Sequence, residues 1–416
     1  MLKKIKAVVY LMFVGGFLFL TVQQAMAIPA WSRLTGSACN SCHATPTWQL
    51  TPFGLEFLGN GHRLEAAPAN FDLTTQKLDN YLSLVWKFRA YVEEEKNPAS
   101  QFEQHAFSLY TGGALSDRFS YFTEMYLNEN TGSTAGSNVV QGDASRKKLA
   151  EAYLQYNQPV GSGFIAVRAG EILPEILHVF GAGARSAEQR ALVLNDKANS
   201  ANPYKPFTRS QGVDAKLKMG PAEVTVGAVN GAMNSTNAID ANNHKDWYAT
   251  ALVNFDEHKS AAGLFHYDGV YSMYTTTLGV SQTDDPTKSV SFNNEFTKDG
   301  LLVRFIRDKW RIVGTYFMGK ETIDAAGGTS KNEGYYGLVD FNITDKLGVF
   351  ARYDMLDPDT NVGSNETTLI MLGLDGMLYM SDKSGARWNL ELTQKEVDTA
   401  TVKKTKRALL QITWAF

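Results

Sequence analysis

Two cysteines and a histidine within one five-residue segment are the side chains of this chain best suited to chemistry. The segment reads Cys39-Asn40-Ser41-Cys42-His43, and it holds both cysteines of the 416-residue chain. In a C-x-x-C-H motif each thiol can bond to one vinyl group of a haem, and the histidine that follows binds the iron. The motif therefore predicts one covalent haem c, attached at Cys39 and Cys42, with His43 as the proximal iron ligand.

Three other uses of paired cysteines explain this segment less well. A structural zinc site needs four nitrogen or sulfur ligands, and the sequence has no second cysteine pair. A redox motif of the thioredoxin type belongs to a βαβ pattern, which the surrounding sequence lacks. A disulfide between Cys39 and Cys42 is chemically feasible in an exported protein, but it leaves the position of His43 unexplained.

The second axial ligand of the iron is expected from the same small segment. No methionine occurs between His43 and the first predicted strand, and the next one downstream is Met125. His62 is the only other imidazole there, and Gly59 and Gly61 would let the backbone fold over a haem. We predict His62 as the distal ligand. In the alternative, His62 is a solvated turn residue and another side chain or water binds the iron.

The first 27 residues have the features of an export signal. Lys3, Lys4 and Lys6 precede an apolar stretch over residues 7–22. The tripeptide Ala25-Met26-Ala27 then matches the small-x-small pattern of a cleavage site, so we expect cleavage after Ala27. An uncleaved membrane anchor is the alternative, because the apolar run approaches the ~20 residues that cross a bilayer.

Further along the chain, apolar and polar residues alternate as they do in β-strands. The last strand shows this best, because one of its faces would carry Ala408, Leu410, Ile412, Trp414 and Phe416. A terminal aromatic residue after such an alternation resembles the C-terminal strand of outer-membrane barrels. The same period of two recurs over 86–93, 119–128 and 388–393.

A soluble β-sandwich would alternate as well, but three features favour a transmembrane antiparallel β-barrel. The predicted strands have about ten to twelve residues, a length suited to crossing a membrane. Their apolar faces are rich in aromatic residues, drawn from 23 Phe and 18 Tyr. The opposite faces carry charges that suit a water-filled lumen, among them Lys87, Arg89, Glu124 and Glu391.

The connections between predicted strands alternate between short and long, as in outer-membrane barrels. Short ones are expected at 159–162, 219–221, 257–258 and 344–345, and long ones at 129–147, 174–207, 232–245, 321–332 and 357–366. The pattern predicts sixteen strands, or eighteen if Asp268-Gly269 and Asp299-Gly300 are hairpin tips. The segment 174–207, with a helix-like stretch at 186–193, is expected to fold into the lumen.

The overall charge argues against a nucleic-acid partner. Lys and Arg number 40 against 43 Asp and Glu, which gives a net charge of -3 without a long basic run. We therefore expect three parts in an all-β protein: a signal peptide over 1–27, a monohaem cytochrome c segment with a linker over 28–80, and a porin-like barrel over 81–416. The haem segment would lie at the periplasmic mouth or inside the barrel.

Three short stretches around the cysteines carry a family resemblance. They read Ala27-Ile28-Pro29-Ala30-Trp31-Ser32-Arg33-Leu34-Thr35-Gly36, then Cys39 to His43, then Leu50-Thr51-Pro52-Phe53-Gly54 with Phe57. Over these residues the chain resembles the fused monohaem cytochrome-porins of the bacterial outer membrane. The resemblance implies an iron oxidase, an oxidoreductase that takes electrons from extracellular Fe(II) and passes them through the haem to a periplasmic c-type cytochrome.

Two other functions stay open at the level of sequence. The same haem and barrel would also serve an outward electron conduit to an external acceptor. A diffusion porin with a structural N-terminal plug is the second alternative. Three loop carboxylates, Asp357, Asp359 and Glu366, are interpreted as solvating residues rather than as an iron site. Outer-membrane lipid surrounds the barrel in every case, and the formation of a homo-oligomer stays open.

Overall fold

The computed structural model describes residues 29–64, 77–94, 96–129, 149–183, 185–195, 202–231, 242–257, 259–276, 279–281, 290–381, 384–398 and 402–416. The signal peptide expected over 1–27 lies outside the described residues, as do residues 130–147 of the loop expected at 129–147 and most of the loop at 232–245. Within the described part, no helix is both long and apolar enough to cross a membrane.

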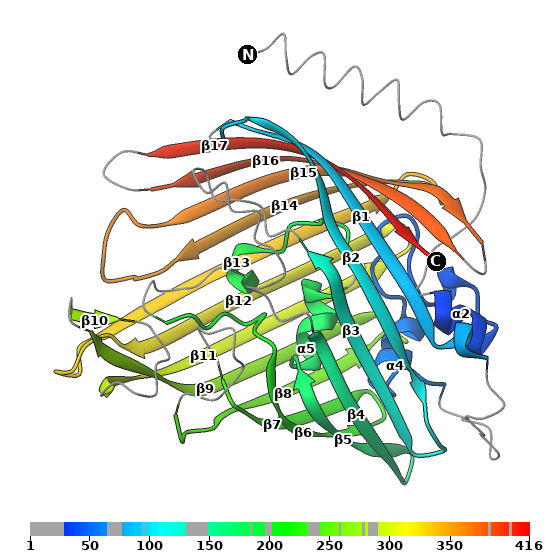
Figure 1. Cartoon of the computed structure of the whole chain (residues 1–416), viewed down its shortest axis with the longest axis horizontal. Coiled ribbons are helices and arrows are strands. Elements are labelled where there is room, and N and C mark those ends of the chain that lie inside the picture. Colours follow the sequence, from blue (N-terminus) through cyan, green and yellow to red (C-terminus); the bar gives the residue numbers. More distant parts are fainter. Residues whose placement is uncertain are drawn as a thin grey trace.

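One antiparallel sheet closes on itself, because the first strand pairs with both the second and the last (Figure 1). Its strands are β1 (Leu82–Glu93), β2 (Ser100–Ala114), β3 (Phe119–Glu129), β4 (Leu149–Val160), β5 (Gly163–Ile172), β6 (Ser210–Met219), β7 (Ala222–Val229), β8 (Asp246–Phe255), β9 (Ser260–Thr276), β10 (Gly279–Ser281), β11 (Val290–Arg307), β12 (Trp310–Thr322), β13 (Thr329–Asn342), β14 (Leu347–Asp357), β15 (Thr367–Met380), β16 (Gly385–Val397) and β17 (Lys403–Ala415). Of these seventeen strands, β10 has three residues and only pairs with the end of β9, so sixteen form the wall.

The count of sixteen strands is confirmed, and the alternative of eighteen is wrong. Asp268-Gly269 lies inside β9 and Asp299-Gly300 lies inside β11, where the two long strands pair with each other. Both dipeptides are paired across β9 and β11, and Asp268 and Asp299-Gly300 are paired on their other side as well, to β8 and β12. This pairing holds them extended despite their turn-forming residue types. The connection expected at 321–332 is also shorter than predicted, because only residues 323–328 separate β12 from β13.

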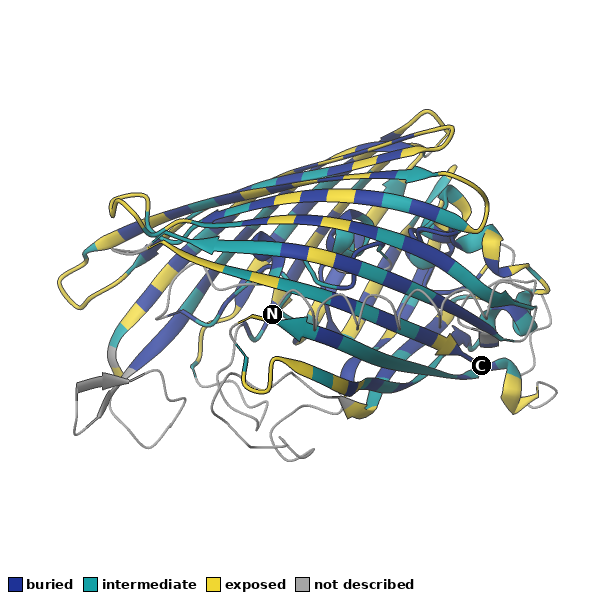
Figure 2. Cartoon of the chain, turned by 90° about the horizontal axis from the view of Figure 1, so that it is seen from above, coloured by how far each residue is buried: buried dark blue, intermediate teal, exposed yellow. Residues whose placement is uncertain are grey.

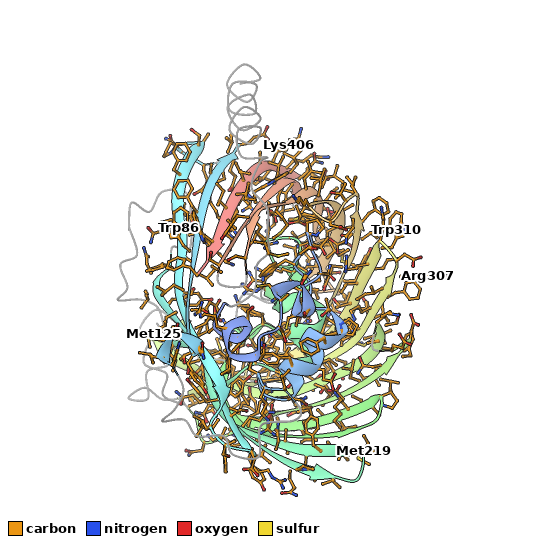
Figure 3. The ribbon with its side chains drawn as sticks, turned by 90° about the vertical axis from the view of Figure 1, so that its right-hand side faces the viewer. Trp86, Met125, Met219, Arg307, Trp310 and Lys406 are labelled. Atoms are coloured by element: carbon orange, nitrogen blue, oxygen red, sulfur yellow. The ribbon has the colours of Figure 1, made fainter. Side chains whose placement is uncertain are left out.

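Side chains alternate between the two faces of the wall as the sequence predicts (Figure 2). Trp310, Ile312 and Leu301 are exposed on the outer face, where lipid would lie. Figure 3 labels Trp310 on this face. Charged residues such as Arg304 and Asp340 are buried on the inner face. This arrangement suits a barrel with an apolar outer band and a polar interior.

The connection between β5 and β6 folds inward and contributes to the hydrophobic core. It contains α5 (Glu175–Leu177), the wide helical turn η4 (His178–Ala182) and α6 (Leu192–Asn195). The inward fold is confirmed, but the helix expected at 186–193 is wrong, since helix begins only at Leu192. Wall side chains instead bond the backbone of the stretch before it, for example Asn389 to the Ser186 carbonyl at 2.9 Å. Those bonds replace the helical ones and keep the stretch open.

Residues 29–64 lie within the ring of strands (Figures 1 and 3). They form α2 (Pro29–Thr35), α3 (Cys39–Cys42) and α4 (Pro52–Gly59), and η2 (Leu78–Asn80) leads into β1. We call residues 29–64 the N-terminal segment. It sits toward the end of the barrel where β1 begins and β17 ends.

Candidate haem site

The short helix α3 brings the two thiols of the motif together. Its four residues run from Cys39 to Cys42, so the two side chains lie one helical turn apart. Both residues are thiols rather than a disulfide. Cys39 is 3% exposed and its Sγ lies 3.5 Å from the Ser381 carbonyl oxygen. The spacing is what two thioether bonds to one haem require.

The stretch after the motif holds α3 in place. The Thr51 amide donates to the Cys42 carbonyl at 2.9 Å, and the Thr51 hydroxyl donates to the Ser41 carbonyl. Gly54 in α4 approaches the Cys42 carbonyl oxygen so closely that a Cβ there would lie 2.1 Å from it. Pro52 begins α4, where its missing N–H costs nothing. The Leu50-to-Gly54 stretch therefore serves as a clamp for the cysteine turn.

His43 is buried and its ring orientation is fixed. Its Nδ1 lies 3.0 Å from the Trp48 carbonyl oxygen. The Trp48 ring stacks on the imidazole, with the ring centroids 4.1 Å apart and an angle of 8° between the ring planes. A carbonyl can only accept, so Nδ1 carries the proton and Nε2 keeps its lone pair. Burial lowers the pKa of His43 to about 4, despite the hydrogen bond to Trp48. A neutral imidazole tied through its other nitrogen to a carbonyl is how metal-binding histidines are usually held. Together with the two thiols, this donor set fits a c-type haem.

His62 lies in a different place, inside an aromatic stack. Its ring is sandwiched between Trp31 and Phe122, with both centroids at 4.4 Å. Its Nδ1 lies 3.3 Å from the Tyr153 hydroxyl. Burial lowers the pKa of His62 to about 3. Gly61 and His62 both take positive φ, at 77° and 60°, so the tight turn expected from the glycines is present.

The structure does not bring the two predicted axial ligands together. Among the described residues, no hydrogen bond or ring contact joins His43 to His62. His62 packs on β3 and β4, whereas Cys39 packs near the end of β15. The role of His62 as distal ligand stays a prediction.

Two features of the site are invisible to motif analysis. Met380, the last residue of β15, packs against Cys39. Lys216 of β6 donates to the Gly59 carbonyl at 2.7 Å and pairs with Glu175 at 2.8 Å. These residues are far from the motif in sequence, so no spacing rule connects them to it.

Contacts around the whole wall hold the N-terminal segment inside the barrel. They are Ala30 N to Ser83 Oγ, Asn342 Nδ2 to the Thr45 carbonyl, Gln49 to Asp340, Asn157 Nδ2 to the Asn60 carbonyl, and Arg63 to the Asp117 carbonyl. Their wall partners lie on β1, β13, β4 and the turn after β2. The segment therefore bridges strands on opposite sides of the barrel.

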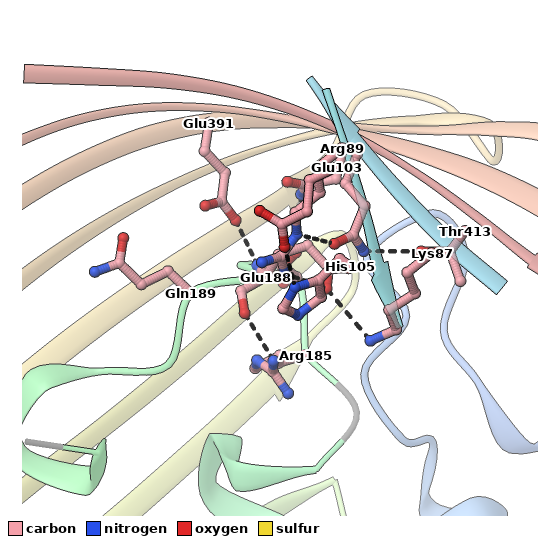
Figure 4. Close-up of polar contacts among 12 residues, drawn as sticks. Lys87, Arg89, Glu103, His105, Arg185, Glu188, Gln189, Glu391 and Thr413 are labelled. Carbon is pink, nitrogen blue, oxygen red and sulfur yellow. Dashed lines mark hydrogen bonds and ion pairs between the residues drawn. The ribbon is translucent and has the colours of Figure 1, made fainter. Parts of the chain in front are cut away.

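The inward loop crosses the lumen beside the segment and carries a charged cluster around Glu188 (Figure 4). Glu188 pairs with Lys87 at 3.6 Å and with Arg387, and its backbone N–H donates to Glu391. Burial raises the pKa of the Glu188 carboxyl, but Lys87 and Arg387 outweigh it and hold the pKa well below its usual range. The cluster is thus held together by ion pairs inside the barrel.

The described residues contain no group of three or more His, Cys, Asp or Glu side chains that could hold a metal ion. In the loop after β14, Asp357 accepts from the Asp359 amide at 3.0 Å, and Asp359 accepts from the Asn361 amide at 3.1 Å. These carboxylates shape their own loop, which agrees with the interpretation of them as loop residues.

Comparisons with known proteins find the fold but no sequence relative. Neither a family model nor a curated protein matches the chain. An anion-selective porin from Comamonas acidovorans is similar in structure, with a TM-score of 0.56 and 12% identity over 80% of this chain and 98% of that one. The outer membrane channel DcaP of Acinetobacter baumannii matches with a TM-score of 0.54 and 15% identity, over 80% of this chain and 96% of that one. A loop-deletion mutant of OmpT of Vibrio cholerae matches with a TM-score of 0.52 and 11% identity, over 80% of this chain and 99% of that one. The chain therefore has the sixteen-stranded barrel fold of outer-membrane porins.

Proposed function

We propose that this chain is an outer-membrane electron-transfer protein, a barrel that holds a covalent haem c in its N-terminal segment. The observation that carries the proposal is the donor set of Cys39, Cys42 and His43, enclosed by the barrel wall and fixed by the Trp48 carbonyl. A haem bonded there would exchange single electrons through its iron.

The chain's own residues would contribute position and shielding. The clamp around Thr51 and Gly54 fixes the thiols, and the wall contacts hold the whole segment in the lumen. A rigid site of this kind loses little energy to rearrangement when its charge changes. The wall spans the membrane, so an electron can be passed inward without importing its source.

The electron source that the resemblance implies is extracellular Fe(II), and the acceptor is a periplasmic c-type cytochrome. Oxidation outside the cell suits this substrate, because ferric iron precipitates near neutral pH. The reverse direction, toward an external acceptor, uses the same residues. Addition of Fe(II) to the purified oxidised protein distinguishes the two. A reduced haem spectrum supports Fe(II) oxidation, and an unchanged spectrum with Fe(II) in excess contradicts it.

A diffusion porin with a structural plug is the second candidate function. The likeness to solved porins favours it, since the barrels match over 96% or more of the length of those porin chains. In this case the segment 29–64 would only narrow the lumen, and the cysteine motif would carry no cofactor.

A denaturing gel stained for haem peroxidase activity separates the two candidates. Covalent haem survives denaturation, so the wild-type band should stain and a Cys39→Ala/Cys42→Ala variant should not. An unstained wild-type band, from cells able to attach haem c, contradicts the electron-transfer proposal. Ion conductance of the same protein in planar bilayers then measures the porin function directly.

A further inference from the structure

We infer that Met380, from the barrel wall, supplies the second axial ligand of the haem whose attachment is proposed above. The inference rests on that proposed function and adds a ligand from outside the N-terminal segment. Its basis is one contact: within the described part of the chain, the buried Cys39 thiol packs against Met380. A haem bonded to the Cys39 sulfur therefore lies beside a thioether.

A β-bulge directs Met380 toward this position. In β15 the even-numbered residues face outward, as the exposed Ile370 and Leu372 show, while Met371 is fully buried on the inner face. Regular alternation would turn Met380 outward too. The pairing of β15 with β16 shifts between Met377 and Tyr379, which reverses the alternation. Bulges re-aim side chains in this way and are frequent beside functional sites.

The pairing partner of Met380 confirms which face it occupies. Met377 pairs with Arg387, which is buried on the inner face and binds Glu188. After the shift, Met380 pairs with Gly385, two residues before Arg387 and so on the same inner face. Gly385 has no side chain, so it does not compete with Met380 for space on that face.

His62, the other candidate ligand, is packed inside an aromatic stack. Its two ring faces are covered by Trp31 and Phe122, and Nδ1 lies at the Tyr153 hydroxyl. This stack lies on β3 and β4, whereas Cys39 packs near the end of β15. Met380 instead contacts Cys39, one of the two residues to which the haem would be bonded.

A methionine ligand has a consequence for electron transfer. Histidine and methionine together raise the reduction potential of a haem above that of a two-histidine centre. A higher potential makes the haem a better acceptor from a weak reductant outside the cell. One ligand from the segment and one from the wall would also join the two parts of the chain through the iron.

The test uses the full-length protein purified with its haem. Met380→Leu keeps size and polarity, and it should convert a six-coordinate low-spin spectrum into a high-spin one, lower the midpoint potential, and allow carbon monoxide to bind the ferrous form. Met380→His should restore the low-spin spectrum at a midpoint below that of the wild type. Heat-modifiable migration on gels checks that each variant has folded.

Two matched controls make the outcome decisive. Met377→Leu changes the same residue type on the inner face of the same strand, and His62→Ala removes the rival ligand. Both should keep the low-spin spectrum and the midpoint. The inference is overturned if Met380→Leu keeps both properties, or if His62→Ala or Met377→Leu loses them while Met380→Leu does not. Absence of haem from the wild type is a separate result, and it overturns the proposed function itself.

Discussion

The buried ion pair between Lys216 and Glu175 is the contact whose removal should loosen the N-terminal segment most clearly. Lys216 Nζ lies 2.8 and 2.9 Å from the two Glu175 carboxylate oxygens and 2.7 Å from the Gly59 carbonyl oxygen. The side chains of Lys216 and Glu175 are only 5% and 11% exposed. One amine thus joins the wall, the inward loop and the segment.

The loss of stability expected for Lys216→Met follows from the buried Glu175 carboxylate that the variant leaves without its partner. Removing one partner of a buried ion pair typically costs about 3–5 kcal/mol, because the other charge stays buried without compensation. Burial raises the pKa of Glu175, but Lys216 and Arg168 outweigh it and lower the pKa to about 2. Arg168 remains in the variant, so we expect the lower end of the range, about 3 kcal/mol, or roughly a hundredfold in an equilibrium constant.

Hydrogen exchange followed by mass spectrometry measures this effect in the folded barrel. Peptides that cover residues 52–64 should exchange roughly a hundredfold faster in Lys216→Met, provided that the segment recloses faster than its amides exchange. Strands on the far side of the barrel should be unaffected. The double variant Lys216→Met/Glu175→Gln should recover most of the protection, since no buried charge is then left alone.

Lys218→Met is the matched control, on the same strand. Its amine lies 3.9 Å from a Glu223 oxygen and, among the described residues, forms no ion pair with the N-terminal segment. We expect a change within about 0.5 kcal/mol, as for a partly exposed pair. Unchanged exchange over 52–64 in Lys216→Met, or an equal acceleration in Lys218→Met, would refute the assignment of Lys216 as an anchor.

Three further predictions concern attachment, assembly and pH. Cys39→Ala/Cys42→Ala should lose covalent haem while the barrel still shows heat-modifiable migration, because wall strands satisfy their own backbone hydrogen bonds; failure to reach the outer membrane would contradict separable modules. Deletion of Phe416 should lower the amount of inserted barrel seen in membrane fractions, since its backbone pairs with Leu84 at 2.8 and 2.9 Å to close the sheet; equal insertion would contradict this. In the folded protein the pKa of His62 is lowered to about 3, so below pH 6.5 this side chain binds a proton in the unfolded chain but not in the folded one. The stability of the segment should therefore fall by about 1.4 kcal/mol per pH unit from pH 6.5 down toward pH 3. His62→Phe should keep the stack and remove this part of the slope, as measured by hydrogen exchange at pH 7 and pH 5; an unchanged slope would mean that His62 does not cause it.

Much of the barrel could be predicted because strand geometry is local. Successive side chains in a strand point to opposite faces, so Trp86 and Phe88 could be assigned to one face and Lys87 to the other from sequence alone. The pairing of Trp86 with Trp414 follows from the closure of such strands. The hairpin tips predicted at 268–269 and 299–300 are wrong, because a turn-forming dipeptide is a weak local signal and pairing along two long strands outweighs it.

The sequence by itself determined the period-two pattern that makes a barrel and the Cys39-to-His43 spacing that suits a haem, because both depend on residues a few positions apart. Only the tertiary structure decided which residues surround that motif. Cys39 and Ser381 are 342 positions apart, and they meet because the closed sheet brings the end of β15 to the N-terminal segment. The bulge that turns Met380 inward is likewise a property of strand register, which is set by pairing across the sheet and not by the residues of one strand.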